Sequence, residues 1–308
     1  MENKIGQKGF HELSYKKHEV WYNQHFPTEE DKIRFLTDNN PDEDNVGNWL
    51  QQIFFSCIDP LLGNGKQSWL TIGDAYGFDA HYILRKPNQI VTASDLNEDF
   101  LRIAKAAGLI TNFASENAEK LSFADDSFDF VLCKETYHHF PRPYAALYEM
   151  IRVAKKGILI IEPQDPVTRM PFLLAMINIL EKIKPSLAGS FWKNQFSYEP
   201  VGNFVYKVSE REFQKFGAGL GLKVVAFKSV NPNFYKKELQ KMRPSLRLGK
   251  FRVIWIKKRL LDLITELGFI PGQVLATIVF KQCPAIAELK QLADAGYKIV
   301  HIPDNPYR

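Results

Sequence analysis

Apolar and polar residues follow two different rhythms along the chain, and together they predict one fold over residues 69–165. Short apolar runs alternate with stretches in which apolar residues recur every three or four positions. The short runs fit buried strands and the three-to-four spacing fits helices, so their alternation is typical of a parallel sheet with crossover helices. Strands are expected at about residues 68–72, 89–95, 110–114, 128–133 and 157–163, with helices at about 79–86, 97–107 and 143–155.

The same patterns extend the sheet toward the end of the chain and place helices before it. Residues 46–60 carry apolar residues at helical spacing, which predicts a helix with one buried stripe. Ser209 and Glu212 have the spacing of a capping box, so a helix is expected to begin there. Residues 222–230 and 273–281 are predicted as the last strands, before a short helix at 285–294 and a tail.

The fold class expected is therefore α/β, with a doubly wound, seven-stranded, Rossmann-like sheet, a helical N-terminal cap and an inserted lid. The expected divisions are a cap at 1–67, a cofactor-binding core at 68–166, a lid or acceptor region at 167–208, and the completion of the sheet at 209–308 with a basic helical insertion at 232–270 and a C-terminal tail.

Composition excludes several protein classes. The longest uncharged runs are 14 residues, whereas a membrane-spanning helix needs about 18 or more. The first ten residues lack the apolar core of a secretory signal, so a cytoplasmic location is expected. The three cysteines are far apart in the sequence. They predict neither a disulfide framework nor a zinc site, and no metal is expected.

Positive charge is concentrated in one segment. Residues 234–260 contain ten Lys or Arg and one acid, a charge of +9 in a chain whose total is +5. The rest of the chain is therefore negative, which argues against a nucleic-acid-coating surface. Within this segment a helix at about 251–268 is amphipathic. Its apolar positions are Val253, Ile256, Leu260, Ile264 and Leu267, with Arg252, Arg259, Asp262 and Glu266 on the other side.

Three explanations of this basic helix are open. It docks on the sheet with a solvated polar face, or it contacts an anionic acceptor or acidic surface, or it makes a peripheral membrane contact.

Small residues follow the first predicted strand. Gly73, Ala75 and Gly77 let the turn approach a ligand closely and leave the next helix N-terminus open to it, although a plain tight turn has the same composition. Asp95 lies 22 residues after Gly73, at the end of the second strand. In doubly wound sheets an acid there binds the ribose hydroxyls of a nucleoside cofactor. The alternative is that Asp95 caps the next helix, a role for which Asn97 is equally suited.

A longer pattern distinguishes among nucleoside cofactors. Residues 115–133 read SENAEKLSFADDSFDFVLC. Three further motifs follow in order: His138-His139-Phe140-Pro141, RVAKKG at 152–157 and Ile161-Glu162-Pro163. From about residue 69 to residue 165 the sequence closely resembles the class I S-adenosylmethionine-dependent methyltransferases. The resemblance implies a methyltransferase with S-adenosylmethionine as cofactor and S-adenosylhomocysteine as product.

The resemblance also implies nine cofactor-binding residues. They are Gly73, Asp74, Ala75 and Gly77 in the first turn, Asp95 and Leu96 after the second strand, Asn117 and Ala118 after the third, and Lys134 after the fourth. By resemblance, Asp95 would hold the ribose hydroxyls, Asn117 would face the adenine amino group, and Lys134 would lie near the methionine end. The family's acid near the cofactor's ammonium group is replaced by Thr71 here, and Asp74 is the candidate to supply that charge.

His138 and His139 are the candidate catalytic bases, because they follow the fourth strand at the edge where ligands bind. His138 is slightly favoured. The alternative is that one or both histidines only pack into the loop. Methyl transfer gains most from alignment of the reactants, and it needs a base only when the acceptor carries a proton.

A small-molecule acceptor is expected, with nucleic acid excluded. Aromatic residues within 167–208 and the basic insertion favour a sugar or a nucleotide-linked sugar, and they fit an anionic acceptor. A lipid or quinone-like ring is the alternative, favoured if residues 170–180 line the pocket. Two functions of other classes would also fit the glycine turn and Asp95. They are a nicotinamide-dependent oxidoreductase and a non-catalytic binding module on the same fold.

Overall fold

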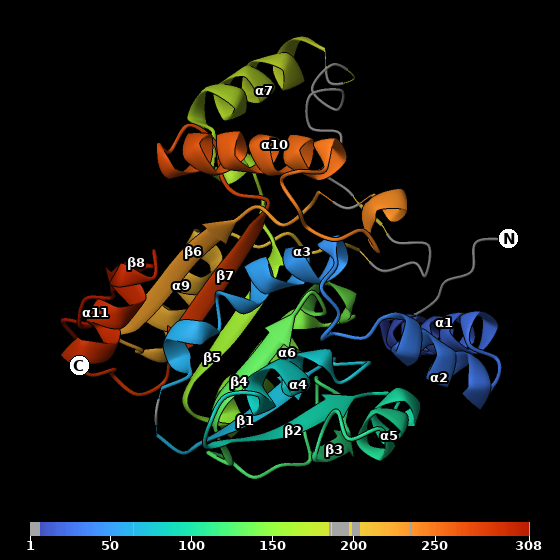
Figure 1. The fold of residues 1–308 in the computed structure, drawn as a ribbon. Helices are drawn as coiled ribbons and strands as arrows, with labels where there is room; N and C mark the ends of the chain where they lie inside the picture. Colours follow the sequence, from blue (N-terminus) through green and yellow to red (C-terminus); the bar gives the residue numbers. More distant parts are fainter. Residues whose placement is uncertain are drawn as a thin grey trace, which may run out of the picture.

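The computed structural model describes residues 7–63, 65–184, 186, 197–198, 204–234 and 236–307. Its centre is one eight-stranded sheet in the order β3-β2-β1-β4-β5-β7-β6-β8 (Figure 1). The strands are β1 (Gln67–Ile72), β2 (Gln89–Asp95), β3 (Asn112–Ser115), β4 (Phe128–Lys134), β5 (Ala154–Pro163), β6 (Val224–Val230), β7 (Val274–Phe280) and β8 (Lys298–His301).

Strands β1 to β5 run parallel, and β7 lies antiparallel between β5 and β6. The reversal of strand order at β1 and β4 creates the crevice in which doubly wound sheets bind ligands. The expected doubly wound, Rossmann-like α/β fold is confirmed, but the count of seven strands is wrong. Residues 298–301, expected as part of a tail, form an eighth strand because they pair with β6 and cover what would otherwise be an open sheet edge.

Helices cover both faces of the sheet. The described helices α4 (Phe78–Leu84), α5 (Asp99–Ala106) and α11 (Ile286–Asp294) contribute to one hydrophobic cluster, whereas α6 (Pro143–Val153) and α9 (Glu210–Leu220) contribute to the other. Alternate residues of a strand point to opposite faces. In β4, Phe130 and Leu132 therefore join the first cluster, and Val131 and Cys133 join the second.

The N-terminal residues form α1 (Gln7–His25), α2 (Glu29–Asp38) and α3 (Val46–Phe55). Thr28 and Asp31 make a capping box that begins α2. Phe26 and Phe35 then pack against Phe100 of α5, with ring centroids 4.9 and 5.8 Å away. These aromatic contacts hold α1 and α2 beside the β2 and β3 side of the sheet (Figure 1).

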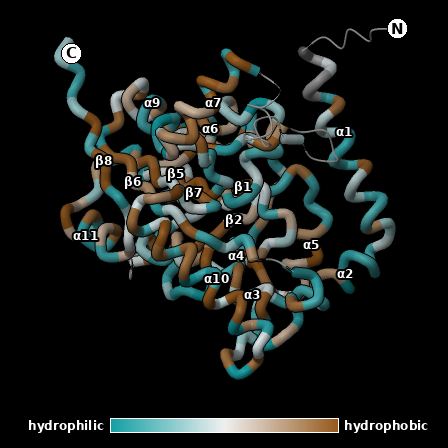
Figure 2. The backbone as a smooth tube through the Cα atoms, turned by 90° about the horizontal axis from the view of Figure 1, so that it is seen from above, coloured by the Kyte–Doolittle hydropathy of each residue, from teal (hydrophilic) through white to brown (hydrophobic). Residues whose placement is uncertain are grey.

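Two further helices, α7 (Pro171–Ile183) and α10 (Gly249–Glu266), lie beyond the sheet at the top of Figure 1. Figure 2 views the molecule from that end and shows the two helices well apart. Helix α10 is attached through Phe251, which is buried and meets Trp49 of α3 with ring centroids 5.1 Å apart. The explanation that its stripe from Val253 to Leu267 docks on the sheet is wrong, because that stripe is exposed. Among the described helices, none combines the length and hydropathy that a bilayer crossing requires.

Candidate active site

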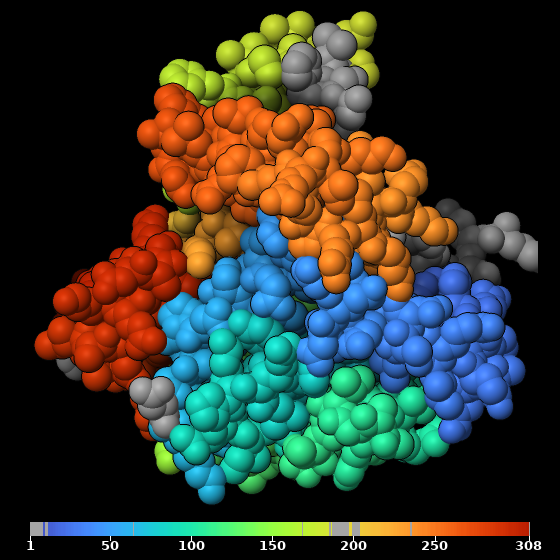
Figure 3. All heavy atoms as spheres, in the orientation of Figure 1, coloured from blue at the N-terminus to red at the C-terminus, as the bar shows by residue number. Residues whose placement is uncertain are grey.

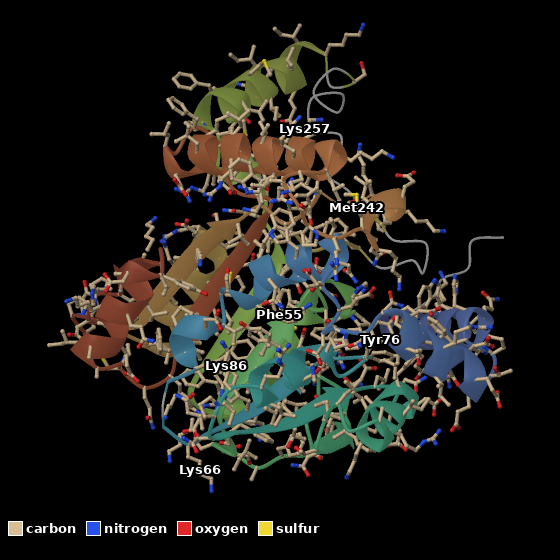
Figure 4. The ribbon with its side chains drawn as sticks, viewed as in Figure 1. Phe55, Lys66, Tyr76, Lys86, Met242 and Lys257 are labelled. Carbon is tan, nitrogen blue, oxygen red and sulfur yellow. The ribbon has the colours of Figure 1, made fainter. Side chains whose placement is uncertain are left out.

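A cavity of about 1620 Å³ opens at the carboxyl ends of β1, β2 and β4. The sheet supplies one wall, α1, α2 and α3 supply another, and the segment 232–241 closes a third side. Figure 4 marks two wall residues from different elements: Phe55 of α3, above the central strands, and Tyr76, on the side of α1 and α2. Of the nine expected cofactor-binding residues, all except Gly77 line this cavity.

The turn after β1 depends on two glycines with positive φ. Gly73 has φ +67°, and a Cβ there would stand 2.0 Å from Cγ2 of Thr136. A side chain at residue 73 is therefore blocked both by conformation and by the loop after β4. Gly77, with φ +75°, precedes α4 and faces Ile110 rather than the cavity. Gly77 thus shapes the turn, and its expected contact with the cofactor stays a prediction.

The carboxylate of Asp74 is used by the chain itself. It accepts hydrogen bonds from Thr71 Oγ1 at 2.9 Å and from the backbone N–H groups of Asp79 and Ala80 at 3.2 and 2.8 Å. Burial raises the pKa of Asp74, although these hydrogen bonds favour its charged form. Asp74 is therefore the cap of α4, and the expectation that it supplies the charge missing at Thr71 is not favoured by this geometry.

A second acid on the same turn faces the cavity and was not found in the sequence. Asp79, in the first turn of α4, lies 3.2 Å from Lys134 Nζ at the end of β4, and both side chains are buried. Lys134 also donates to Gln51 Oε1 of α3 at 3.4 Å. Burial raises the pKa of Asp79 to about 7 and outweighs the opposing attraction of Lys134. An acid in a first helical turn is ordinarily explained by the helix dipole, so the sequence gave no separate signal for this pair.

Lys134 keeps its charge in this site. Burial lowers the pKa of its ammonium, but the carboxylates of Asp79 and Glu135 outweigh burial and hold the pKa above its usual value. The ammonium also lies 5.4 and 5.6 Å from the ring centroids of Phe54 and Phe55, close enough for cation–π attraction. The pair gives this end of the cavity one fixed cation and one acid.

Asp95 lies at the opposite end of the crevice. One of its oxygens, Oδ1, accepts the N–H of Asn97 at 2.9 Å, while Asn97 in turn accepts from Asp99. Burial raises the pKa of Asp95 to about 6, and no Lys or Arg among the described residues forms an ion pair with it. A carboxylate in the cavity wall fits the two hydroxyl donors of a ribose.

Helix α1 covers the expected adenine end. Tyr15 OH lies 3.5 Å from Asn117 Oδ1, which also accepts the N–H of Glu119 at 2.9 Å. Leu96 is 48% exposed, and with Ala118 it lines the cavity between these polar groups. A flat apolar slot with an amide at its rim suits an adenine ring. Tyr15 was not expected here, because no regular apolar pattern marks α1 in the sequence.

The structure separates the two candidate histidines. His138 Nδ1 lies 2.5 Å from Glu162 Oε2, and the other oxygen of this buried glutamate accepts the N–H groups of Thr136 and Tyr137, both at 2.7 Å. His138 is thus part of the hydrogen bonding that holds the loop, and it does not line the cavity. The geometry thus favours His139 over His138 as the candidate base, and a catalytic role for either histidine stays a prediction.

His139 lines the cavity instead. Its ring meets that of His18 on α1 edge to face, with centroids 5.5 Å apart, and His18 also lines the cavity. His18 belongs to a seven-residue series with His11 and His25, which is a weak signal in the sequence alone. Within the described residues no cluster of metal-ligating side chains is found.

The remaining wall differs from the expected acceptor region. Its lining residues are Gly47, Asn48, Leu50, Gln51 and Gln52 of α3, together with Pro232, Asn233, Gln240 and Lys241. The described residues of 167–208 do not line the cavity, because α7 extends away from the sheet. Phe191, Trp192 and Phe196 lie outside the described residues. A ligand pocket usually measures about 300–1,000 Å³, so a cavity of about 1620 Å³ has room for a cofactor and an acceptor.

Comparison with known proteins gives the family. A family model described as a methyltransferase domain matches residues 70–161. A demethylmenaquinone methyltransferase from Chlorobaculum parvum is 30% identical over 171 residues, which are 54% of this chain and 69% of that protein. The protein of the same name from Chlorobaculum tepidum is 30% identical over 169 residues, 53% of this chain and 68% of that protein.

A solved structure, of an S-adenosylmethionine-dependent methyltransferase from Archaeoglobus fulgidus, is 15% identical, with a TM-score of 0.44 over 86% of this chain and 99% of that one. The two sequence relatives and the family model carry the assignment. The chain belongs to the class I S-adenosylmethionine-dependent methyltransferases.

Proposed function

We propose that this methyltransferase transfers the methyl group to a carbon of a quinone-like ring in its reduced, dihydroxy form. The observation that carries the proposal is the 30% identity, over more than half of the chain, to two proteins named demethylmenaquinone methyltransferase. The described aromatic residues of the expected lid, Tyr198, Phe204 and Tyr206, stand outside the cavity wall. This placement removes one reason for preferring a sugar. Residues 170–180 do not line the cavity either, so the relatives, and not that segment, favour the quinone-like ring.

The polar groups of the acceptor wall support a ring with two oxygens. Gln51 of α3 and Lys241 line the cavity and carry N–H donors. The side-chain amide of Asn48 also lines it but donates to the carbonyls of Asn40 and Glu43. Such donors would orient a dihydroxy ring and favour its ionised form. Lys241 also accounts for the expected preference for an anionic acceptor.

The reaction needs a proton acceptor and a fixed alignment. When bound, S-adenosylmethionine supplies a methyl group that its positively charged sulfur already activates for displacement. His139 is the proposed base: removal of a ring hydroxyl proton makes the neighbouring carbon nucleophilic. That carbon would form its bond to the methyl group as the carbon–sulfur bond breaks. It would then lose its own proton to water, while the ring oxygen recovers the proton held by His139. Asp95 and Lys134, at two ends of the crevice, would set the alignment.

The test is an assay of the purified chain, under reducing conditions, with a short-chain demethylmenaquinol and with nucleotide-linked sugars as parallel acceptors. The proposal expects S-adenosylhomocysteine and a ring product one methylene heavier only with the quinol. Turnover of a nucleotide-linked sugar but not of the quinol would reject the proposal and favour the sugar as acceptor.

A further inference from the structure

The outer side of α10 carries apolar residues where a soluble helix would carry polar ones. Six large aliphatic residues there are 40–62% exposed. They are Val253, Ile256, Leu260, Leu263, Ile264 and Leu267. At 3.6 residues per turn these positions fall within roughly 100° of the helix circumference. Figure 3 shows α10, in orange, across the front of the molecule with no other segment in front of it.

Basic residues border this stripe on both sides. By the same helical period, Arg252 and Arg259 lie along one edge, and Lys250 and Lys257 along the other. All four are exposed, and none forms a salt bridge with another described residue. Lys258, on the inner side, is paired with Asp262 at 2.6 Å. Figure 4 marks Lys257 on this helix.

We propose that the outer face of α10 binds the surface of an anionic lipid bilayer, with its six aliphatic residues among the acyl chains and its four flanking cations at the phosphate groups. A wide apolar stripe bordered by Lys and Arg is the pattern of helices that lie in a membrane interface. A nucleic acid would neutralise the cations but leave the aliphatic residues in water. A second copy of the chain would bring two cationic borders together, with Glu266 as the exposed acid of α10.

The rest of the molecule is consistent with this orientation. Helix α7, at the same end, also exposes a stripe of its own: Phe172 is 91% exposed, Ile179 58% and Ile183 74%. The segment that leads into α10 contributes Gln240 and Lys241 to the cavity wall. Docking through α10 would therefore bring the acceptor side of the cavity near the bilayer. The proposal itself rests on α10 and does not depend on the identity of the acceptor.

The test is sedimentation of the full chain with vesicles, without cofactor or acceptor. Vesicles of phosphatidylcholine with phosphatidylglycerol are expected to bind the chain, vesicles of phosphatidylcholine alone are expected to bind it much less, and high salt is expected to weaken binding. Ile256→Glu with Leu260→Glu should reduce binding at least tenfold. Neutralising Arg252, Lys257 and Arg259 to Gln should reduce it roughly fivefold for each charge.

Matched controls come from α11, where Ile286 is 87% exposed and Lys290 is also exposed. Ile286→Glu and Lys290→Gln should leave binding unchanged, and thermal unfolding of each variant reports whether it folds. Failure of the unaltered chain to bind anionic vesicles would overturn the proposal, as would equal binding by the α10 variants. If light scattering shows a dimer that Ile256→Glu dissociates, the outer face of α10 binds a second copy of the chain, and the proposal is overturned.

Discussion

The two halves of the cavity are built in different ways. The half expected to hold the cofactor is formed by strand ends and tight turns, where Gly73 fits against Thr136 and Asp74 caps α4. The acceptor half is formed by residues of α3 and by Pro232, Asn233, Gln240 and Lys241. Helix α3 meets α10 in a small cluster that includes Trp49 and Phe251. If the proposed site is right, the difference means that the common fold holds the cofactor, whereas the added segments select the acceptor.

The largest expected effect comes from substituting the two histidines after β4. His139→Gln should lower kcat by about 10²–10⁴-fold if it removes the base, with cofactor affinity unchanged because His139 is on the acceptor side. His138→Gln is the matched control. It breaks the hydrogen bond to buried Glu162, so it should lower the midpoint of thermal unfolding and leave the pH profile of kcat in place. If both variants lost kcat equally and were equally stable, the loss would come from a disturbed loop and not from a missing base.

Asp95→Ala probes the cofactor half. Hydrogen bonds to a charged carboxylate are lost, and one such bond contributes about 1.5–3 kcal/mol. The net loss of one bond should therefore raise the dissociation constant of S-adenosylhomocysteine about 10- to 150-fold. Calorimetry measures it directly. Asp125→Ala, whose carboxylate is exposed and pairs with Arg152, is the control. An unchanged dissociation constant in Asp95→Ala would remove this residue from the site.

Lys241→Ala tests the acceptor half. Lys241 is exposed at the cavity wall, so the loss of one solvated charge should raise the acceptor KM by only about 2- to 5-fold, in line with about 0.2–1 kcal/mol for an exposed pair. Cofactor affinity should stay constant. A parallel change in cofactor affinity would mean that the two halves are not separate.

The pH dependence of cofactor binding is the most gradual expected effect. Burial raises the pKa of Asp95 to about 6, and ribose hydroxyls bind best to the ionised carboxylate. Binding should therefore be constant above pH 7 and weaken by up to about tenfold per pH unit as pH falls below 6. Titration calorimetry from pH 5 to pH 8 checks this, and Asp95→Asn should remove the dependence. A pH dependence of binding that persists in Asp95→Asn would come from the titration of another group.

The sequence predicted most of the sheet because the strands from β1 to β7, apart from β3, are largely apolar runs whose residue types fit a buried strand. The short β3 has exposed ends, and it was expected from the alternation of strands and helices around it. The sequence missed β8, which has only four residues and alternates exposed ends with partly buried centres. Helices α1 and α2 were not predicted individually, because their contacts with Phe100 depend on the assembled fold. Periodicity showed which residues of α10 share a face, but not that this face points outward, since Phe251 and Ile254 occupy the inner side.

The site could be predicted only where one segment carries the information. The turn after β1 and Asp95 lie at strand ends that the pattern locates. The choice between His138 and His139 depends on Glu162, which is 24 residues away in the sequence, and the pair of Asp79 and Lys134 joins α4 to β4. Such pairings arise from topology, so single-sequence patterns do not contain them.

The central claim is that the crevice at the carboxyl ends of β1, β2 and β4 holds S-adenosylmethionine, with His139 at the methyl position. A crystal structure of the chain with S-adenosylhomocysteine tests it most directly. We predict the ribose hydroxyls within hydrogen-bond distance of Asp95, the adenine between Leu96 and Ala118, and the sulfur facing His139. Density for the product elsewhere, or Asp95 turned away from an occupied crevice, would contradict the account.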